Sequence, residues 1–325
     1  SGSITCIVLI AAGITAGLIY AYRRKKYYLH LALLSLSFIL IGYSTYFVIL
    51  IRANAYPPID MQNVTNPITL VSYLDRSQYG TWPIIYGPDF TAQPIGTKVI
   101  GNVYKKDTAT GRYIVVGKKL KAVYNPADEH LFPRVWDNDN SQGHVSFYQH
   151  ELGLAKGEKP TFGDAVYFFF RDQLWWMYFR YLLWNYAGRQ NDIQGIYPDN
   201  TRDGNWITGI SFIDNWRLGD QSKMPDSLKH NKAHNKLYML PLLLGIIGLI
   251  YQYKRSRHEF YVVFLLFFFT GIAIVIYLNQ GLPQPRERDY SYVGSFYAFA
   301  IWIGLGVIGL YDLISKHAQP KAGYA

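Results

Sequence analysis

Two apolar runs near the carboxyl end, FYVVFLLFFFTGIAIVIYL (260–278) and VGSFYAFAIWIGLGVIGLYDLI (293–314), are joined through the charged segment Pro285-Arg286-Glu287-Arg288-Asp289-Tyr290. Each run is long enough to cross a bilayer, since about 20 apolar residues in a helix span the hydrocarbon core. The connection is therefore held at a membrane surface, where ionisable groups are costly unless they pair or serve a function. Two guanidiniums and two carboxylates in so short a loop favour a charged ligand head group, such as a phosphate at the lipid–water boundary.

The composition of the whole chain supports a membrane protein. Hydrophobic residues make up 50% of the 325 residues and charged residues only 17%, which fits the membrane class better than a soluble globular one. We predict a mainly α fold of polytopic membrane helices, with a large mixed α/β extracytoplasmic domain that contains a small antiparallel β insert. The five predicted spans are residues 4–22, 28–51, 237–253, 260–278 and 293–314. The predicted domains are a transmembrane hairpin (1–51), the extracytoplasmic domain (52–236), three transmembrane helices (237–315) and a cytoplasmic tail (316–325).

The distribution of charge predicts the orientation. The short loops 23–26 and 254–257, together with the tail, contain nine Lys/Arg residues, and only Glu259 and Asp312 oppose them, a net of +7. Short loops rich in Lys and Arg stay in the cytoplasm. We therefore expect a bacterial inner-membrane protein whose chain starts outside and whose residues 52–236 and charged loop face the periplasm. Because the positive charge marks topology, we expect no nucleic-acid partner.

One aromatic segment does not fit the count of spans. Residues 167–186 include 11 aromatic residues among 20, but also Arg171, Asp172 and Arg180. These charges are expensive at mid-bilayer, and a sixth span would place Arg255 and Arg257 outside. We predict an interfacial helix near residues 165–187, with a buried aromatic core helix of the outer domain as the alternative. Neither version crosses the membrane.

Two further patterns concern the outer domain. Residues 98–124 contain β-rich runs broken by glycines, with Thr108-Ala109-Thr110-Gly111 as a hairpin turn. His230 and His234 lie four residues apart, a spacing that suits a metal on one helix face, but no third ligand of fixed spacing accompanies them. We therefore predict no metal site and no cofactor.

Two motifs carry a resemblance to a known family. The first comprises Arg52, Pro57-Pro58-Ile59-Asp60, Asn66-Pro67 and Tyr73-Leu74-Asp75-Arg76-Ser77-Gln78-Tyr79-Gly80. The second is Gln284-Pro285-Arg286-Glu287-Arg288-Asp289-Tyr290 running into Val293-Gly294-Ser295-Phe296-Tyr297-Ala298. Over nearly its whole length the chain resembles a bacterial membrane family similar to eukaryotic transmembrane protein O-mannosyltransferases. The resemblance implies a multi-pass C-type glycosyltransferase that uses a polyprenyl-phosphate-linked sugar on the outer membrane face. The family's acidic catalytic loop lies in an amino-terminal half that nothing here matches, so the chain looks like the carboxy-terminal half.

Candidate phosphate ligands follow from this chemistry. Transfer from a phosphate-linked sugar needs positive charge on the departing phosphate and a general base for the acceptor. Arginine suits the first task because its planar fork binds phosphate in a bidentate manner and stays charged. Arg286 and Arg288 are therefore the candidate donor-phosphate ligands, with Arg52 at the outer end of the second span as a third.

The catalytic acid is left open by the sequence. Glu287, Asp289 and Asp60 are the acidic groups near the outer membrane face. Glu287 and Asp289 either orient the arginines or supply base chemistry in place of the family's main acid, which this chain lacks. In a purely structural alternative, Arg–carboxylate pairs in the loop pin two helix ends together.

The predicted partners are a lipid-linked sugar donor, membrane lipids, a protein or glycan acceptor and the amino-terminal half of the same protein. An alternative of a different class is a non-enzymatic envelope subunit whose outer domain docks a partner. A transporter is the least favoured class, because the spans carry almost no mid-membrane polar residues and no paired broken helices.

Overall fold

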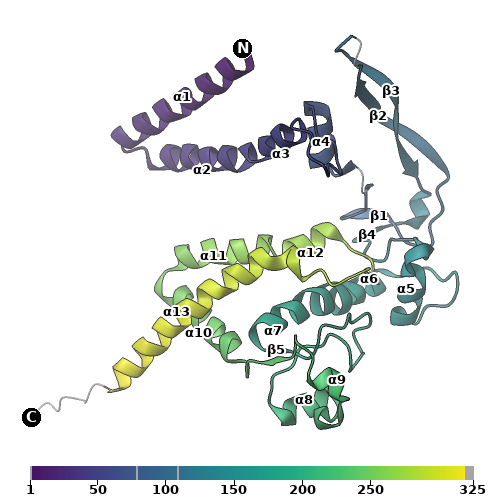
Figure 1. Ribbon diagram of the computed structural model, residues 1–325, viewed down its shortest axis with the longest axis vertical. Helices are drawn as coiled ribbons and strands as arrows, with labels where there is room; N and C mark the ends of the chain where they lie inside the picture. Colours follow the sequence, from purple (N-terminus) through teal and green to yellow (C-terminus); the bar gives the residue numbers. More distant parts are fainter. Residues whose placement is uncertain (1, 78–79, 108–109, 319–325) are drawn as a thin grey trace, which may run out of the picture. The chain divides into compact units, whose positions relative to one another are not determined.

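The computed structural model describes residues 2–77, 80–107 and 110–318. The described chain is mainly helical with small antiparallel sheets, as predicted. It divides into two compact units (Figure 1). The first unit comprises Ser1–Thr81 with Val103–Gly117, and the second comprises Trp82–Asn102 with Lys118–Ala325. Most of the predicted extracytoplasmic segment thus shares one unit with the helices that follow it.

The first unit consists chiefly of helices. They are α1 (Gly2–Arg23), α2 (Tyr27–Ser44), α3 (Tyr46–Ala53) and α4 (Pro67–Leu74). The helix α4 begins with a capping box, in which the side chain of Asn66 accepts hydrogen bonds from the first turn and the hydroxyl of Thr69 accepts one from the Asn66 backbone N–H. This arrangement satisfies backbone N–H groups that have no partner inside a helix.

Four helical stretches are long and apolar enough to cross a membrane. They are Thr5–Arg23, Tyr27–Ala53, Arg257–Leu278 and Asp289–Lys316, and they correspond to four of the five predicted spans. The remaining predicted span, 237–253, forms the shorter helix α10 (Leu240–Arg255), which has 16 residues. At 1.5 Å per residue, 16 residues reach about 24 Å, which is less than the hydrocarbon core of a typical bilayer.

In the second unit, α10 packs closely against α13 (Val293–Ala318). Glycines make this approach possible. A Cβ atom added to Gly248 would lie 1.8 Å from the carbonyl oxygen of Trp302, and one added to Gly306 would lie 2.0 Å from that of Leu244. Small residues at helix interfaces allow backbones to approach in this way. The indole of Trp302 adds a buried hydrogen bond to Gln252, at 2.8 Å.

The predicted aromatic segment is one continuous helical rod. It consists of α6 (Phe162–Phe168), the π-helical η4 (Phe169–Phe179) and α7 (Arg180–Tyr186). Side chains from η4 and α7 share a core cluster with α11 (Arg257–Phe269), α12 (Ile272–Leu278) and α13. Tyr178 and Trp302 are almost completely buried in this cluster. The rod is thus buried against helices that lie outside residues 52–236, and it is not among the four stretches suited to crossing a membrane.

Three small sheets complete the described structure. Their pairs are β1 (Tyr86–Pro88) with β4 (Glu129–Leu131), β2 (Gly96–Lys106) with β3 (Tyr113–Val123), and β5 (Gly188–Arg189) with β6 (Asn235–Lys236). The pair β2–β3 is the predicted β insert, but its predicted turn includes residues 108–109, which lie outside the described ranges. Short helices between the sheets are α5 (His144–Leu152), α8 (Ser211–Leu218) and α9 (Asp226–Lys229), and residues 126–128, 140–142, 221–223 and 289–292 form short 3-10 turns.

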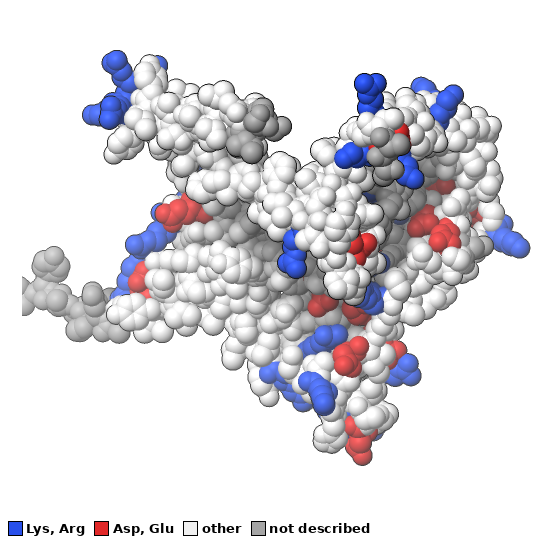
Figure 2. Space-filling model, turned by 45° about the horizontal axis from the view of Figure 1, so that its top comes forward, with Lys and Arg blue, Asp and Glu red and all other residues white. Residues whose placement is uncertain are grey.

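Charged side chains are unevenly distributed over the surface. In Figure 2, Lys, Arg, Asp and Glu gather on the lobe at the bottom of the view, which carries α8 and α9, and broad areas elsewhere are uncharged. Large apolar side chains are exposed along α11 and α13, including Val262, Leu265 and Val307. An apolar helix surface of this kind is expected where lipid rather than water surrounds the helix.

Candidate functional site

The charged loop between α12 and α13 is anchored at its start by a buried asparagine. Asn279 is fully buried and ends α12 in the left-handed backbone region, which asparagine tolerates better than most residues. Its amide donates to the carbonyl oxygens of Pro83, at 2.6 Å, and Pro133, at 2.8 Å. Its carbonyl oxygen accepts from Gln173 Nε2, at 3.1 Å. The loop therefore starts from a fixed position against the segment before α5.

A histidine and a glutamine anchor the middle of the loop. The carbonyl oxygen of Pro283 bonds His144 Nε2 at 3.1 Å, and that of Gln284 accepts from Gln194 Nε2 at 2.5 Å. His144 Nδ1 lies 2.8 Å from Asp137. Burial lowers the pKa of His144, but the hydrogen bond and charge of Asp137 outweigh burial and leave that pKa above its ordinary value. The contact between His144 Nε2 and the Pro283 carbonyl oxygen attaches the loop to α5.

Glu287 is held by a bidentate ion pair. Arg180 Nη1 lies 3.0 Å from Oε1 and Nη2 lies 2.7 Å from Oε2. Oε2 also accepts from the hydroxyl of Tyr181, at 2.5 Å, and Oε1 from the backbone N–H of Gly195, at 2.9 Å. Four donors thus surround a carboxylate that is only 14% exposed. These contacts favour an orienting role for Glu287 over a role as a free base.

Arg180, the partner of Glu287, was missed as a site residue in the sequence. Its side chain is only 2% exposed. It lies against the rings of Trp176, Tyr181 and Trp184, with its guanidinium carbon 4.1, 4.6 and 4.7 Å from the three ring centroids. Aromatic faces attract cations, so the aromatic residues around position 180 were the available signal. Nothing in the sequence indicated Glu287 as the partner of Arg180.

Arg286 and Arg288 have no carboxylate partner among the described residues. Arg286 is exposed, and its guanidinium carbon lies 5.5 Å from the ring centroid of Tyr290. Arg288 is partly buried, and its Nε is a buried donor with no hydrogen-bond acceptor in the described part of the chain. The predicted pairing of loop arginines with loop carboxylates is therefore not the arrangement observed. Glu287 pairs with Arg180 instead. The guanidiniums of Arg286 and Arg288 are therefore able to bind another anion.

Asp289 lies in the electrostatic neighbourhood of Arg189, a second arginine that sequence reasoning missed. Arg189 is stacked 3.8 Å from the ring centroid of Trp184, and its Nε donates to the carbonyl oxygen of Asn191 at 2.9 Å. Burial lowers the pKa of Arg189, while the negative charges of Asp289 and Glu287 oppose that shift. With Arg180, Arg286 and Arg288, Arg189 is therefore the fourth guanidinium near the charged loop.

Arg52 and Asp60 belong to the first unit, whereas the charged loop belongs to the second. Arg52 is exposed in the last turn of α3. Asp60 is exposed in the following loop and accepts a hydrogen bond from the Asn63 backbone at 2.9 Å. Arg286, Glu287, Arg288 and Asp289 thus lie together in one anchored loop of the second unit. Arg52 and Asp60 are part of the first unit.

The described residues contain no group of three or more His, Cys, Asp and Glu side chains arranged to hold a metal. Of the histidine pair with metal-like spacing, His234 directs Nδ1 to the carbonyl oxygen of Gln190, at 2.8 Å. This hydrogen bond gives His234 a structural contact of its own.

Comparison with known proteins gives one partial match. Residues 80–170 match the "Family of unknown function (DUF8416)". That region runs from before β1 to the start of η4 and includes His144 and Asp137, but it ends before Arg180 and the charged loop. No curated protein and no solved structure matches the chain.

Proposed function

We propose that this chain is part of an integral-membrane glycosyltransferase. It transfers a sugar from a polyprenyl-phosphate-linked donor to a protein or glycan acceptor on the outer face of the bacterial inner membrane. One observation carries the proposal: Arg286 and Arg288 have no carboxylate partner among the described residues, and they immediately precede the candidate span Asp289–Lys316. At that position a guanidinium can meet a phosphate at the lipid–water boundary.

The arginines supply electrostatic stabilisation in this proposal. When the bond between the sugar and its phosphate breaks, negative charge grows on the departing phosphate oxygen. Positioned guanidiniums stabilise that charge in the transition state. Arg288 is the better positioned of the two, because its partly buried side chain and anchored backbone lose little freedom on binding. Its backbone N–H lies 3.2 Å from the hydroxyl of Tyr181, as a donor.

The general base comes from another group than Glu287 in this proposal. All four hydrogen bonds to Glu287 fix the orientation of its carboxylate and occupy both of its oxygens. Asp289 is the remaining acid of the loop, and the family resemblance implies a main acid in an amino-terminal half. The role left to Glu287 is to hold Arg180, and with it the aromatic rod, against the loop.

The anchoring of the loop favours one second candidate function. Buried contacts through Asn279, His144 and Glu287 fix the loop to the rest of the second unit. Such contacts are also expected in a non-enzymatic envelope subunit, where the loop is a structural link and the outer domain docks a partner. The two functions differ in what the free arginines do.

A transfer assay separates them. Membranes containing the intact protein are supplied with a lipid-linked sugar, and labelled product is measured for Arg286→Lys and Arg288→Ala. Since charge-assisted hydrogen bonds to phosphate contribute about 1.5–3 kcal/mol, we expect about a tenfold loss or more at unchanged protein level. Arg202→Ala is the matched control, because Arg202 is an exposed arginine paired with Asp203 outside the loop. Loss of folded protein in step with activity would support the structural function, as would transfer that both variants leave unchanged.

A further inference from the structure

A cavity of about 520 Å³ lies in the lobe that carries α8 and β6, and it is lined by residues between 207 and 236. Small-molecule sites typically have volumes of about 300–1,000 Å³, so the cavity is large enough for a ligand of sugar size. None of its lining residues belongs to the charged loop. The proposed glycosyl transfer therefore leaves this cavity without a role.

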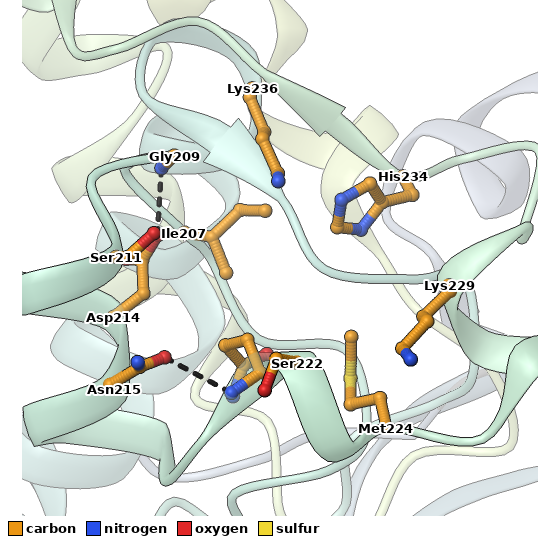
Figure 3. A pocket seen from close by; sticks show the side chains of 11 residues that line it. Ile207, Gly209, Ser211, Asp214, Asn215, Ser222, Met224, Lys229, His234 and Lys236 are labelled. Carbon is orange, nitrogen blue, oxygen red and sulfur yellow. Dashed lines mark hydrogen bonds between the residues drawn. The ribbon is translucent and has the colours of Figure 1, made fainter.

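Two lysines give the cavity a positive character. Figure 3 shows the side chains of Lys229 and Lys236 reaching into the cavity from different sides. In the described part of the chain, neither amino group lies within ion-pair distance of a carboxylate. Lysine ammonium groups are compact, strongly hydrated charges that suit phosphate and carboxylate groups.

The acid that lines the cavity is already engaged. Asp214 is 4% exposed. Its Oδ1 accepts from the backbone N–H and the hydroxyl of Thr208, at 2.8 and 3.0 Å, and its Oδ2 accepts from the backbone N–H of Gly209, at 2.7 Å (Figure 3). These bonds hold the carboxylate against its own loop, so the two ammonium groups outnumber the acid in the lining. The cavity accordingly favours an anion.

Other polar side chains and two apolar ones complete the lining. His234 donates Nδ1 to the Gln190 carbonyl and borders the cavity, and Asn215 accepts from the Gln221 backbone through Oδ1, which leaves its amide N–H groups as donors. Ile207 and Met224 provide apolar surface. Donors for hydroxyl or anionic oxygens beside a small apolar surface are the combination that suits a sugar ring, which presents both hydroxyls and C–H groups.

We propose that this cavity binds a small anionic ligand that carries hydroxyl groups, a sugar phosphate or a sugar acid, with Lys229 and Lys236 contacting the anionic group. Phosphate and carboxylate are the two sources of the same chemistry. The inference goes beyond the proposed function and stands without it, because no residue is shared between the two sites.

Calorimetric titration of the purified protein tests the inference, with glucose 6-phosphate, glucuronate, glucose and inorganic phosphate as separate probes. We expect saturable binding of at least one anionic sugar, and at least tenfold weaker binding of both glucose and inorganic phosphate. Lys229→Gln and Lys236→Gln should each weaken the anionic probe about tenfold, whereas Lys232→Gln, an exposed lysine outside the lining, should bind like the wild type.

Lysine acylation read by mass spectrometry gives a second measurement that needs no variant. The bound anionic sugar should slow the modification of Lys229 and Lys236 and leave that of Lys232 unchanged. Absence of saturable binding by both anionic sugars overturns the inference. It is also overturned if glucose binds as tightly as they do, or if the two lysine variants bind like the control.

Discussion

Arg180 and Glu287 are 107 residues apart in the sequence and form a bidentate pair in the structure. Burying two charges is costly, and their attraction offsets that cost only where the geometry is good and the remaining donors are satisfied. Here the aromatic rings of Trp176, Tyr181 and Trp184 enclose the cation, and Gly204 accepts from Arg180 Nη1 at 2.8 Å. At the scale of single residues, this pair decides which charges of the loop remain free.

A second buried ionisable side chain, that of Asp172, has no such partner. It is fully buried in η4, and neither of its carboxyl oxygens has a hydrogen-bond donor among the described residues. Burial, together with the nearby charge of Glu151, raises the pKa of Asp172 to about 8. Asp172 is therefore protonated and neutral in the folded protein at pH 7, and ionised in the unfolded chain.

This difference predicts how stability depends on pH. Between about pH 4 and pH 8 the folded state holds a proton on Asp172 that the unfolded state has lost. Unfolding free energy must then fall as pH rises, by up to about 1.4 kcal/mol per pH unit. The variant Asp172→Asn removes this dependence. We expect its melting temperature in detergent to match the wild type near pH 4 and to exceed it increasingly toward pH 8.

The control for this experiment is Asp203→Asn, which removes an acid that is paired with exposed Arg202. It should follow the wild type at every pH. If the melting temperatures of Asp172→Asn and the wild type change in parallel from pH 5 to pH 8, Asp172 is ionised in the folded protein. That result would contradict a buried, protonated Asp172.

Residue types were predictable from the sequence, and their pairing was not. The sequence identified the loop charges at 286–289 because their position between two apolar runs is unusual. It did not identify Arg180 or Arg189, since the tertiary contacts that make them relevant join segments about 100 residues apart. Arg286 and Arg288 lack a carboxylate partner because Glu287 pairs with Arg180, and only the structure shows that pair.

At the scale of elements, the contact between α10 and α13 depends on glycines on both helices. The apolar runs predicted both helices, and four of the five predicted spans are long enough to cross a membrane. The close approach was not predicted, because apolar composition does not specify which face of a helix meets a neighbour. A helix was predicted near residues 165–187, but its burial against α11, α12 and α13 was not.

The glycine contact can be tested by adding a single methyl group. Gly306→Ala would place a Cβ atom 2.0 Å from the carbonyl oxygen of Leu244, so the helices must separate. Such overpacking typically costs about 1–3 kcal/mol, and we expect a clear drop in melting temperature. Gly304→Ala on the same helix is the control, because a Cβ atom there meets nothing within 4 Å. Equal melting temperatures for the two variants would show that α10 and α13 do not pack through Gly306.

At the scale of the whole molecule, the number and direction of the membrane crossings decide which solvent each loop meets. The charge of the short loops predicts five crossings, whereas α10 is shorter than the four stretches suited to crossing. If α10 crosses, the loop at Ser256 faces the cytoplasm and the charged loop faces the periplasm. If α10 does not cross, these two assignments are reversed.

Cysteine labelling in intact cells distinguishes these arrangements. Ser256→Cys and Ser291→Cys are made in a Cys6→Ser background, since Cys6 is the only cysteine of the chain. Because the positive residues 254–257 favour the cytoplasm, we expect a membrane-impermeant maleimide to label position 291 and to label position 256 only after lysis. Labelling of position 256 from outside would contradict five crossings and would place the charged loop on the cytoplasmic side.

The proposed glycosyl transfer requires that Arg286 and Arg288 bind the phosphate of the lipid-linked donor. The most direct measurement is binding of polyprenyl phosphate to the protein in nanodiscs, followed by native mass spectrometry, for the wild type, Arg288→Ala and the control Arg202→Ala. We expect the wild type and Arg202→Ala to retain the lipid equally, and Arg288→Ala to lose most of it while remaining folded. Equal retention of polyprenyl phosphate by all three proteins would contradict the assignment of the charged loop as the phosphate site.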